Sequence, residues 1–201
     1  MNLRKCFLLL TLALTAGLLP SCSITQKPGA GLAAYQSYDR PAKLPENPDN
    51  VTVKVSIRRQ RAYVMEGQEM LLAMPISVGT PSTPTPRGHF RITDKQEKRR
   101  TRNGSPTPYW CGFAPKLGFH TGWLKHYPCT DGSIRMHENL APKFFRLVKP
   151  GTPVEISYSQ PEDLIVGKIP LPPDSGPLPD YPDNLYKGDG YFRQHKEPVF
   201  Q

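Results

Sequence analysis

Residues 120–133 hold side chains of the types that acyl-transfer chemistry uses. His120 can move a proton, Ser133 and Cys129 carry a hydroxyl and a thiol, and Asp131 is a carboxylate. A serine nucleophile needs a base that takes its proton during attack, and an aspartate can orient such a base. Gly132 stands directly before Ser133, where it permits a tight turn. These residue types suit nucleophilic catalysis.

Two cysteines, Cys111 and Cys129, remain beyond residue 22. In an oxidising compartment two such cysteines usually pair, provided that the fold brings their Cα atoms within disulfide reach. We therefore expect a disulfide between them, in which neither is a nucleophile. A zinc site from His120, His126, Cys129 and His137 is not predicted, because the spacing fits no common zinc motif.

The N-terminus has the features of an export signal. Two basic residues precede an apolar run over residues 7–19, which is too short to span a bilayer. Leu-Pro-Ser-Cys at 19–22 resembles the bacterial lipobox, in which the cysteine is acylated and becomes the new N-terminus. We expect residues 1–21 to be a lipoprotein signal peptide and Cys22 to carry a membrane anchor. Ser23, the next residue, is compatible with sorting of the lipoprotein to the outer membrane. An ordinary signal peptide with an incidental cysteine is the alternative.

Charge and composition divide the rest of the chain into three parts. Residues 22–50 mix Pro, Gly, Ala and polar residues, which is typical of a flexible tether. Residues 51–158 hold 17 Lys and Arg against 7 Asp and Glu, a net charge of +10, and should attract an acidic partner. For an exported protein this is cell-wall polymer or anionic lipid; no nucleic-acid motif is present. Residues 159–201 form a Pro-rich tail with a net charge of −3.

Alternating apolar residues predict a domain made mostly of strands. A helix is expected over residues 139–148, with Asn139 as its cap and Pro142 in its first turn. Residues 94–106 and 127–138 are expected to be loops. The fold class is all-β or β-rich α+β. The expected strands are 51–57, 61–65, 70–78, 89–93, 107–113, 116–121 and 152–158.

Three stretches resemble the catalytic domain of the L,D-transpeptidase family (YkuD type). "VGTPSTPTPRGHFRI" is similar to the family's Gly-x-x-x-x-x-Thr-Pro-x-Gly-x-Phe passage. "TPYWCGF" and "LGFHTG" are similar to its Pro-Tyr-Trp strand and to the strand that ends in the family histidine. "YPCTDGSIRM" resembles its Tyr-Pro-Ala-Ser-His-Gly-Cys-Ile-Arg-Met loop, and "VKPGTPVEI" follows. The resemblance covers residues 51–157.

The resemblance implies a curled β-sandwich with one or two short helices, and neither cofactor nor metal. Family members cut peptidoglycan tetrapeptide stems between an L- and a D-centre, form a thioester with cysteine, and pass the acyl group to an amine. By position, His120 is the acid/base and Ser133 replaces the cysteine. The amides around Gly132 and Ser133 could form an oxyanion hole.

The resemblance also assigns roles to four neighbours. Arg135 matches the family arginine and could hold a stem carboxylate or a structural partner such as Glu138. Tyr109 and Trp110 are expected in or near the donor groove, with core packing as the alternative. Asp131 stands where the family has histidine. It either orients His120 in a triad or, like the serine, is a substitution that followed the loss of catalytic function.

Three functions follow from this pattern. The leading hypothesis is an envelope lipoprotein in the periplasm that acts on peptidoglycan stems through His120 and Ser133. The second is a catalytically inactive domain that binds or tethers peptidoglycan. The third is an L,D-carboxypeptidase, in which water hydrolyses the acyl-enzyme.

Overall fold

The computed structural model describes residues 40–125, 127–169, 187–194 and 197–201. The predicted signal peptide, the predicted lipidation site at Cys22 and parts of the predicted tether and tail lie outside these residues.

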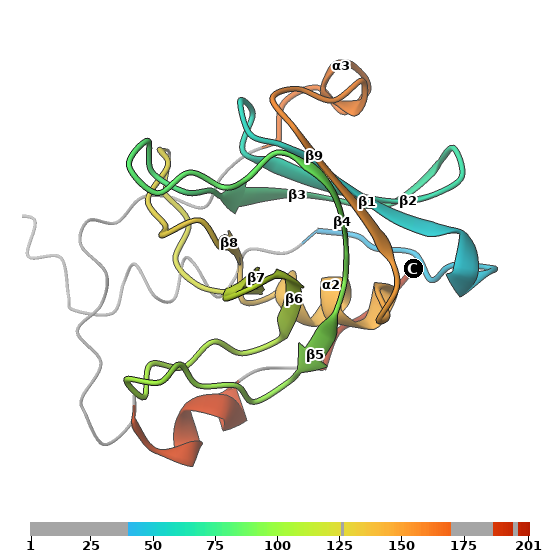
Figure 1. Ribbon diagram of the computed structural model, residues 1–201. Coiled ribbons are helices and arrows are strands. Elements are labelled where there is room, and N and C mark those ends of the chain that lie inside the picture. Colours follow the sequence, from blue (N-terminus) through green and yellow to red (C-terminus); the bar gives the residue numbers. More distant parts are fainter. Residues whose placement is uncertain (1–39, 126, 170–186, 195–196) are drawn as a thin grey trace, which may run out of the picture.

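Nine strands form one continuous sheet in the order β4-β9-β1-β2-β3-β8-β7-β6-β5 (Figure 1). Neighbours are antiparallel except β1 with β9 and β7 with β8, which are parallel. The strands are β1 (Val51–Ser56), β2 (Arg61–Glu66), β3 (Glu69–Ser77), β4 (Gly88–Arg91), β5 (Asp94–Gln96), β6 (Trp110–Ala114), β7 (Leu117–Thr121), β8 (Ile134–Met136) and β9 (Pro153–Ser157). The helical elements are η1 (Pro48–Asn50), α2 (Ala141–Leu147), α3 (Glu162–Ile165) and η2 (Asp189–Gln194).

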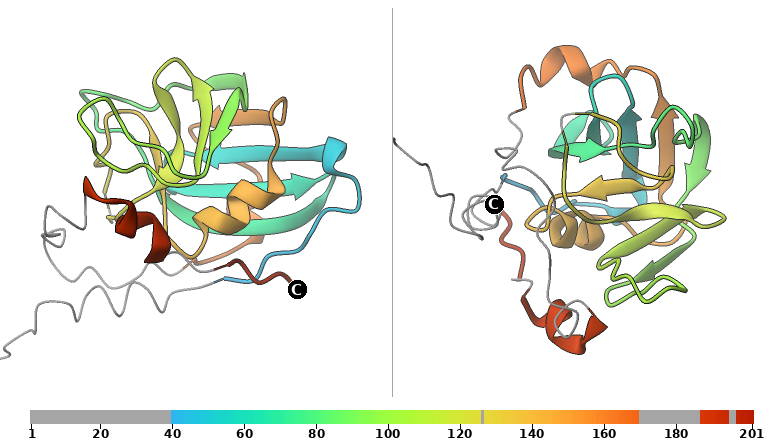
Figure 2. Two further views of the ribbon diagram at one scale, coloured as in Figure 1. Left: turned by 90° about the horizontal axis from the view of Figure 1, so that it is seen from below. Right: turned by 90° about the vertical axis from the view of Figure 1, so that its left-hand side faces the viewer.

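The sheet curls around β3 into two halves. β3 pairs with β2 along most of its length, but with β8 only through its last residues, Ile76 and Ser77. The β4-β9-β1-β2 half and the β8-β7-β6-β5 half therefore diverge from β3, and α2 lies beside the second half (Figures 1 and 2). The predicted mainly β, curled β-sandwich with short helices is confirmed.

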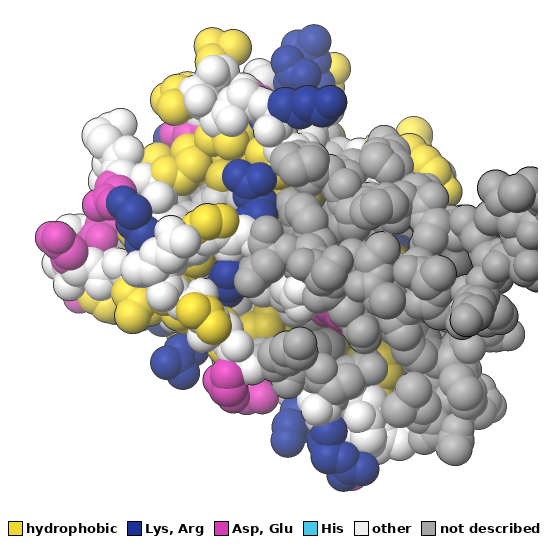
Figure 3. Space-filling model, turned by 180° about the vertical axis from the view of Figure 1, so that it is seen from behind, with side chains coloured by type: hydrophobic (Ala, Val, Ile, Leu, Met, Phe, Trp, Pro, Cys, Tyr) yellow, Lys and Arg dark blue, Asp and Glu magenta, His cyan; other side chains and the backbone are white. Residues whose placement is uncertain are grey.

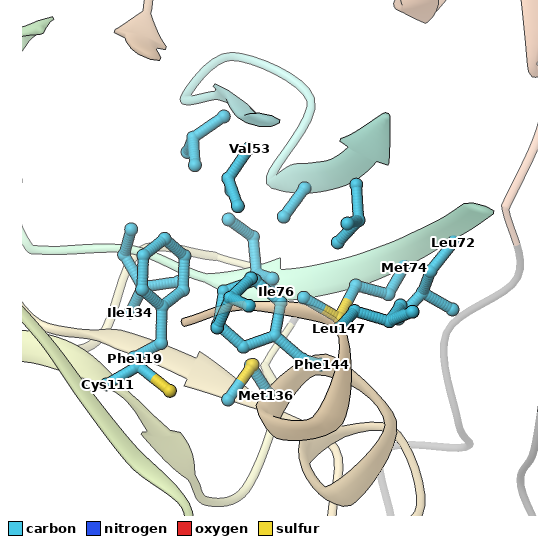
Figure 4. Packing of buried hydrophobic residues seen from close by; sticks show 14 of the residues in the cluster. Val53, Leu72, Met74, Ile76, Cys111, Phe119, Ile134, Met136, Phe144 and Leu147 are labelled. Carbon is cyan, nitrogen blue, oxygen red and sulfur yellow. The ribbon is translucent and has the colours of Figure 1, made fainter. Parts of the chain in front are cut away.

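The core fills the space between the two halves of the sheet and α2 (Figure 4). Phe119 of β7 lies at its centre, with ring centroids 4.6 Å from Phe144 of α2 and 5.4 Å from Phe113 of β6. Val53 of β1 and Ile76 of β3 belong to the same cluster. Burying these apolar side chains is what drives the chain to curl.

Two predicted loops contain short strands. β5 lies within the predicted loop 94–106, and β8 lies within the predicted loop 127–138. Both strands have only three residues, and their partners are distant in the sequence, so local alternation gives no signal for them. The helix prediction was right in type, but its cap was wrong. The N-cap is Leu140 without a side-chain hydrogen bond, and the Asn139 N–H donates to His137 Nδ1 at 3.1 Å.

Parts of the predicted tether and tail pack on the domain. Ala42 is buried, and Lys43 N–H donates to the carbonyl of Leu71 at 3.0 Å. In the tail, Tyr191 is buried, and the Arg100 guanidinium donates to the carbonyl of Gly188 at 2.8 Å. In the described part of the chain, no helix has the length and apolar character needed to cross a membrane.

Candidate active site

The predicted base lies on β7, and the predicted nucleophile lies directly before β8, the neighbouring parallel strand. Phe119 of β7 is opposite Ile134 of β8, and His120 is opposite Arg135. Phe119 and Ile134 are fully buried in the core, and successive side chains of a strand point to opposite faces. His120, Arg135 and Ser133 therefore project from the face of the sheet that is turned away from the core.

His120 is held in one tautomer by a backbone carbonyl. Its Nδ1 lies 2.8 Å from the carbonyl oxygen of Thr121, which can only accept, so Nδ1 carries the proton and Nε2 has the free lone pair. Burial lowers the pKa of His120 to about 4, and the positive charges of Arg135 and Arg99 contribute in the same direction. The imidazole is therefore neutral at neutral pH.

This lowered pKa predicts a pH-dependent loss of stability. The unfolded chain binds the His120 proton at its ordinary pKa of 6.5 and the folded chain only at about 4, so stability falls as the pH drops through this window. Between about pH 7.5 and about pH 5, we expect the native protein to lose about 1–2 kcal/mol more than His120→Gln, with allowance for partial exposure of the ring. Urea unfolding of both proteins at both pH values measures this difference. Parallel losses in the two proteins would contradict it.

Trp110 of β6 forms a wall beside His120. The indole and imidazole stack with centroids 6.1 Å apart and an interplanar angle of 22°, and the indole Nε1–H donates to Asp94 Oδ2 at 3.0 Å. Gly118 leaves the space that the indole needs, because a Cβ there would lie 2.7 Å from the Trp110 ring. Arg99 lies over the indole, with its Cζ 3.7 Å from the ring centroid. The stack places a cation close to the base.

The turn before Ser133 is organised by Thr130. Its hydroxyl donates to the carbonyl of Ser133 at 2.5 Å and accepts the N–H of Gly132 at 3.2 Å. Gly132 has φ 97°, a conformation that favours glycine. Because its N–H is engaged by Thr130, Gly132 does not offer the free oxyanion-hole donor expected from the sequence. The Ser133 hydroxyl accepts the N–H of Gly118 at 3.3 Å.

A buried hydroxyl joins this turn to the segment after β3. Thr85, 4% exposed, accepts the N–H of Gly79 and donates to the carbonyl of Gly132, both at 2.9 Å. Gly79 also passes close to the turn, since a Cβ on Gly79 would lie 2.9 Å from the Gly132 Cα. The stretch 78–92 therefore supports the candidate nucleophile.

The sequence matches the model of the L,D-transpeptidase catalytic domain over residues 50–156, more than half of the chain. The chain belongs to this family. No curated protein matches it. The domain resembles solved L,D-transpeptidases from Stackebrandtia nassauensis (TM-score 0.52, 19% identity, 65% of this chain and 66% of that one), Xylanimonas cellulosilytica (0.51, 17%, 63% and 68%) and Mycobacterium smegmatis (0.50, 20%, 54% and 58%). At these identities the likeness is one of fold, and the chain spans about two thirds or less of those proteins.

Asp131 does not complete a triad in this L,D-transpeptidase domain. Its side chain is exposed, and among the described residues it makes no hydrogen bond to His120. The carbonyl of Thr121 takes the orienting position instead. Of the two alternatives considered for Asp131, the one in which it orients His120 does not hold in this structure, where its side chain is exposed.

The predicted disulfide is not formed, and Cys111 and Cys129 are both free. Cys111 lies on β6, whereas Cys129 N–H donates to the carbonyl of Val78, directly after β3, at 2.9 Å. β8 and β7 separate those strands. At about 4.8 Å per strand, the separation exceeds the Cα reach of a disulfide, about 7 Å. Burial also raises the pKa of Cys111 to about 12, so this thiol is not a nucleophile.

Arg135 forms no ion pair with Glu138, the structural partner considered from the sequence. Its Nη1 lies 3.7 Å from Cys129 Sγ, and among the described residues it contacts no carboxylate. Burial raises the pKa of Glu138 to about 7, whereas a guanidinium partner would lower it. Arg135 is thus available to bind an anion.

Tyr109 and Trp110 face different surroundings. Tyr109 packs edge-on against Phe145 of α2, with centroids 5.6 Å apart, and adjoins the core, whereas Trp110 stands beside His120. Of the pair expected near the groove, the structure places only Trp110 next to the base. In the described ranges, no three His, Cys, Asp or Glu side chains gather as a metal site.

Sequence reasoning missed several residues that shape the site. Thr85 is the threonine of the quoted Thr-Pro-x-Gly passage, so the motif itself could have drawn attention to it. Asp94 and Arg99 lie in the stretch predicted as an exposed charged loop. Their contacts with Trp110 depend on the pairing of β5 with β6, for which the sequence gives no local signal.

Proposed function

We propose that this domain binds peptidoglycan stem peptides and transfers their acyl group through an ester on Ser133. The observation that carries the proposal is the state of His120, a neutral imidazole with Nε2 unprotonated on the same face as Ser133. A serine must be deprotonated during attack and needs a neutral base, whereas a cysteine thiolate pairs with an imidazolium. The histidine therefore suits the residue that replaces cysteine.

The reaction would proceed in two acyl transfers. Ser133 Oγ attacks the carbonyl at the L-centre of the stem while His120 Nε2 takes the hydroxyl proton. The tetrahedral intermediate expels the amine of the D-residue, which receives that proton from His120, and an ester remains. An acceptor amine then attacks the ester and gives a proton to His120, which passes it to the Ser133 oxygen as that oxygen leaves, so that the amide product and the free enzyme result. Water in place of the amine gives the L,D-carboxypeptidase reaction.

Binding without catalysis is the second candidate, and the contacts of Ser133 favour it. Its hydroxyl is bonded to Gly118 N–H, and among the described residues no hydrogen bond joins it to His120. Catalysis requires these two groups to approach when substrate binds, which is common for sites seen without substrate. In a domain that only binds, they would stay apart.

The experiment that separates these functions uses a tetrapeptide-stem muropeptide and the chain from residue 23 onward. Intact-mass analysis would detect an ester on the protein, and chromatography would detect released D-residue and either cross-linked or hydrolysed product. Binding is measured in the same samples by calorimetry. Ester formation supports catalysis, and saturable binding without ester or product supports the tethering function. If the protein neither forms an ester nor binds the muropeptide, both functions are contradicted.

Two guanidinium groups near His120 favour a substrate with a free carboxylate. Arg99 contacts the Thr107 hydroxyl at 3.1 Å and the Trp110 ring, and like Arg135 it has no carboxylate partner among the described residues. The leaving D-residue, whose amine His120 would protonate, carries the C-terminal carboxylate of the stem. Arg99 and Arg135 would bind that group.

Replacing Arg99 by glutamine is expected to weaken binding of the free-carboxylate stem by about tenfold, because a charge-assisted hydrogen bond is lost. Binding of the C-terminal amide of the same stem should already be weak and should change little. Calorimetric titration with both peptides measures the preference, and exposed Arg102 in the same segment provides the control variant Arg102→Gln. Equal loss for acid and amide would show that Arg99 does not bind the carboxylate.

The place of action completes the proposal. The apolar run and the lipobox-like Leu-Pro-Ser-Cys at 19–22 support export and acylation of Cys22, which would hold the domain at the envelope beside its polymer. The net charge of +10 over residues 51–158 favours the anionic wall as partner. Mass analysis of the mature N-terminal peptide tests the acylation directly.

A further inference from the structure

α3 exposes its apolar side chains and buries an acidic one. Leu164 and Ile165, which we call the apolar pair, are 87% and 78% exposed, whereas Glu162 is 5% exposed. A surface helix normally turns its apolar residues toward the core, and grouped exposed apolar side chains mark interaction sites. Tyr158, directly after β9, is 58% exposed and adds to the apolar surface.

Hydrogen bonds hold α3 in this orientation. Asp163 accepts the hydroxyls of Tyr63 and Ser56, both at 2.7 Å. Lys54 Nζ lies 2.5 Å from Glu162 Oε1. Because these contacts fix the polar side of α3 on the sheet, the apolar pair cannot turn inward without leaving buried polar groups unpaired. The exposure of the pair is therefore built into the fold.

Exposed cations lie beside the apolar pair. Arg58 and Arg59 are in the turn between β1 and β2. Arg58 N–H donates to the carbonyl of Tyr158 at 2.9 Å, and Arg59 N–H donates at 3.4 Å to the Ser56 hydroxyl that also binds α3. Exposed Lys168 follows α3. Figure 3 shows hydrophobic side chains and a group of Lys and Arg side chains at the upper end of the molecule, where Figure 1 places α3.

We propose that this end of the molecule, the α3 tip (Arg58, Arg59, Tyr158, Leu164 and Ile165), docks on a bilayer that contains anionic phospholipids. Aliphatic side chains that project from a basic surface fit the boundary between acyl chains and anionic headgroups, and tyrosine favours the same boundary. A stable protein interface buries about 800 Å² per partner, more than three projecting side chains supply. Charge and size therefore both favour lipid.

Docking through the α3 tip would also orient the domain. α3 lies at one end of the molecule, and β5, β6 and β7 lie toward the other in Figure 1 and in the right-hand view of Figure 2. With α3 on the membrane, the strands that carry the candidate site face away from the lipid. The value of this orientation rests on the proposed function, because the orientation turns the candidate site toward the cell wall. The lipid contact itself does not depend on catalysis.

Vesicle co-sedimentation tests the contact, with the chain from residue 23 onward, which keeps every described residue. Vesicles are made of phosphatidylcholine alone or of equal parts phosphatidylcholine and phosphatidylglycerol. We expect binding to the mixed vesicles only. Leu164→Ser combined with Ile165→Ser should lower the partition coefficient by about tenfold or more. Arg58→Gln combined with Arg59→Gln should lower it on the order of fivefold per residue at low salt.

Leu44→Ser is the matched control, because Leu44 is also an exposed leucine, at 57%, and lies outside the α3 tip. It should bind vesicles like the native chain, and thermal unfolding verifies that all variants fold. Absence of native binding to the mixed vesicles, or equal binding by the Leu164/Ile165 variant, would overturn the proposal. So would self-association in sedimentation that the same variant abolishes, which would assign the tip to a second copy of the chain. Stem binding, measured on the same proteins, reports separately on the proposed function.

Discussion

Replacing Ser133 by alanine is expected to abolish formation of the acyl-ester and to leave stem binding intact. Removing a nucleophile lowers the rate of acyl transfer by about 10³-fold or more, roughly 4 kcal/mol of transition-state stabilisation. Ser133 is partly exposed and its hydroxyl receives a hydrogen bond only from Gly118 N–H among the described residues, so its loss should cost little stability. Intact-mass analysis for the ester and calorimetry for the stem measure the two effects independently.

Ser133→Cys is the informative companion variant. A thiol is intrinsically the better nucleophile, but it works as a thiolate paired with an imidazolium. With the pKa of His120 at about 4, the imidazolium is scarce at neutral pH, so the cysteine variant should gain little over the native serine. A large gain in turnover for Ser133→Cys, beside an inactive native protein, would instead show that the candidate site still suits a thiol. The native function would then be binding.

The roles of His120 and Ser133 were predicted from the resemblance to the family motifs, and local features of the sequence explain why the two residues stand where those motifs place them. The sequence pattern predicts β7 as a strand. Because Phe119 is buried, the next residue, His120, points to the opposite face of the sheet. Gly132 makes the turn before Ser133, and its φ of 97° shows why glycine is needed there. Each of these inferences needs only the neighbouring residues.

The triad and the disulfide failed because both depend on distant parts of the chain. Asp131 lies beside Ser133 in sequence, yet its direction is set by a turn that Thr85 and Thr130 hold in place. Cys111 and Cys129 are separated by strand order, which follows from the parallel pairing of β7 with β8. Composition and periodicity carry no information about either arrangement.

The passage from Gly79 to Thr85 supports the nucleophile turn through a buried side chain. One hydroxyl satisfies an N–H on that passage and a carbonyl on the turn, in a place that is 4% exposed. Backbone contacts join the start of this passage to the turn, through the Gly79–Thr130 bridge and the Thr80 N–H, which donates to the Thr130 carbonyl at 3.0 Å. The Thr85 hydroxyl adds the link to the Gly132 carbonyl. The position of Ser133 relative to Gly118 and His120 therefore depends on it.

Thr85→Val is expected to lower the free energy of unfolding by about 2–4 kcal/mol, because it keeps the shape of the side chain but leaves the Gly79 N–H and the Gly132 carbonyl unpaired in a buried place. Because most of the protein remains folded, the loss of stability alone should not change kcat. We nevertheless expect kcat to fall by about 10²-fold with KM little changed, because a displacement of about 1 Å at the nucleophile is sufficient for such a loss. The control is Thr83→Val: that hydroxyl donates to the Thr130 carbonyl at 3.1 Å, but the residue is exposed, so water can replace the bond and the cost should stay below about 1 kcal/mol. Urea unfolding and steady-state turnover of the two variants decide the matter. Equal effects at positions 83 and 85 would mean that the buried hydroxyl does not position the turn.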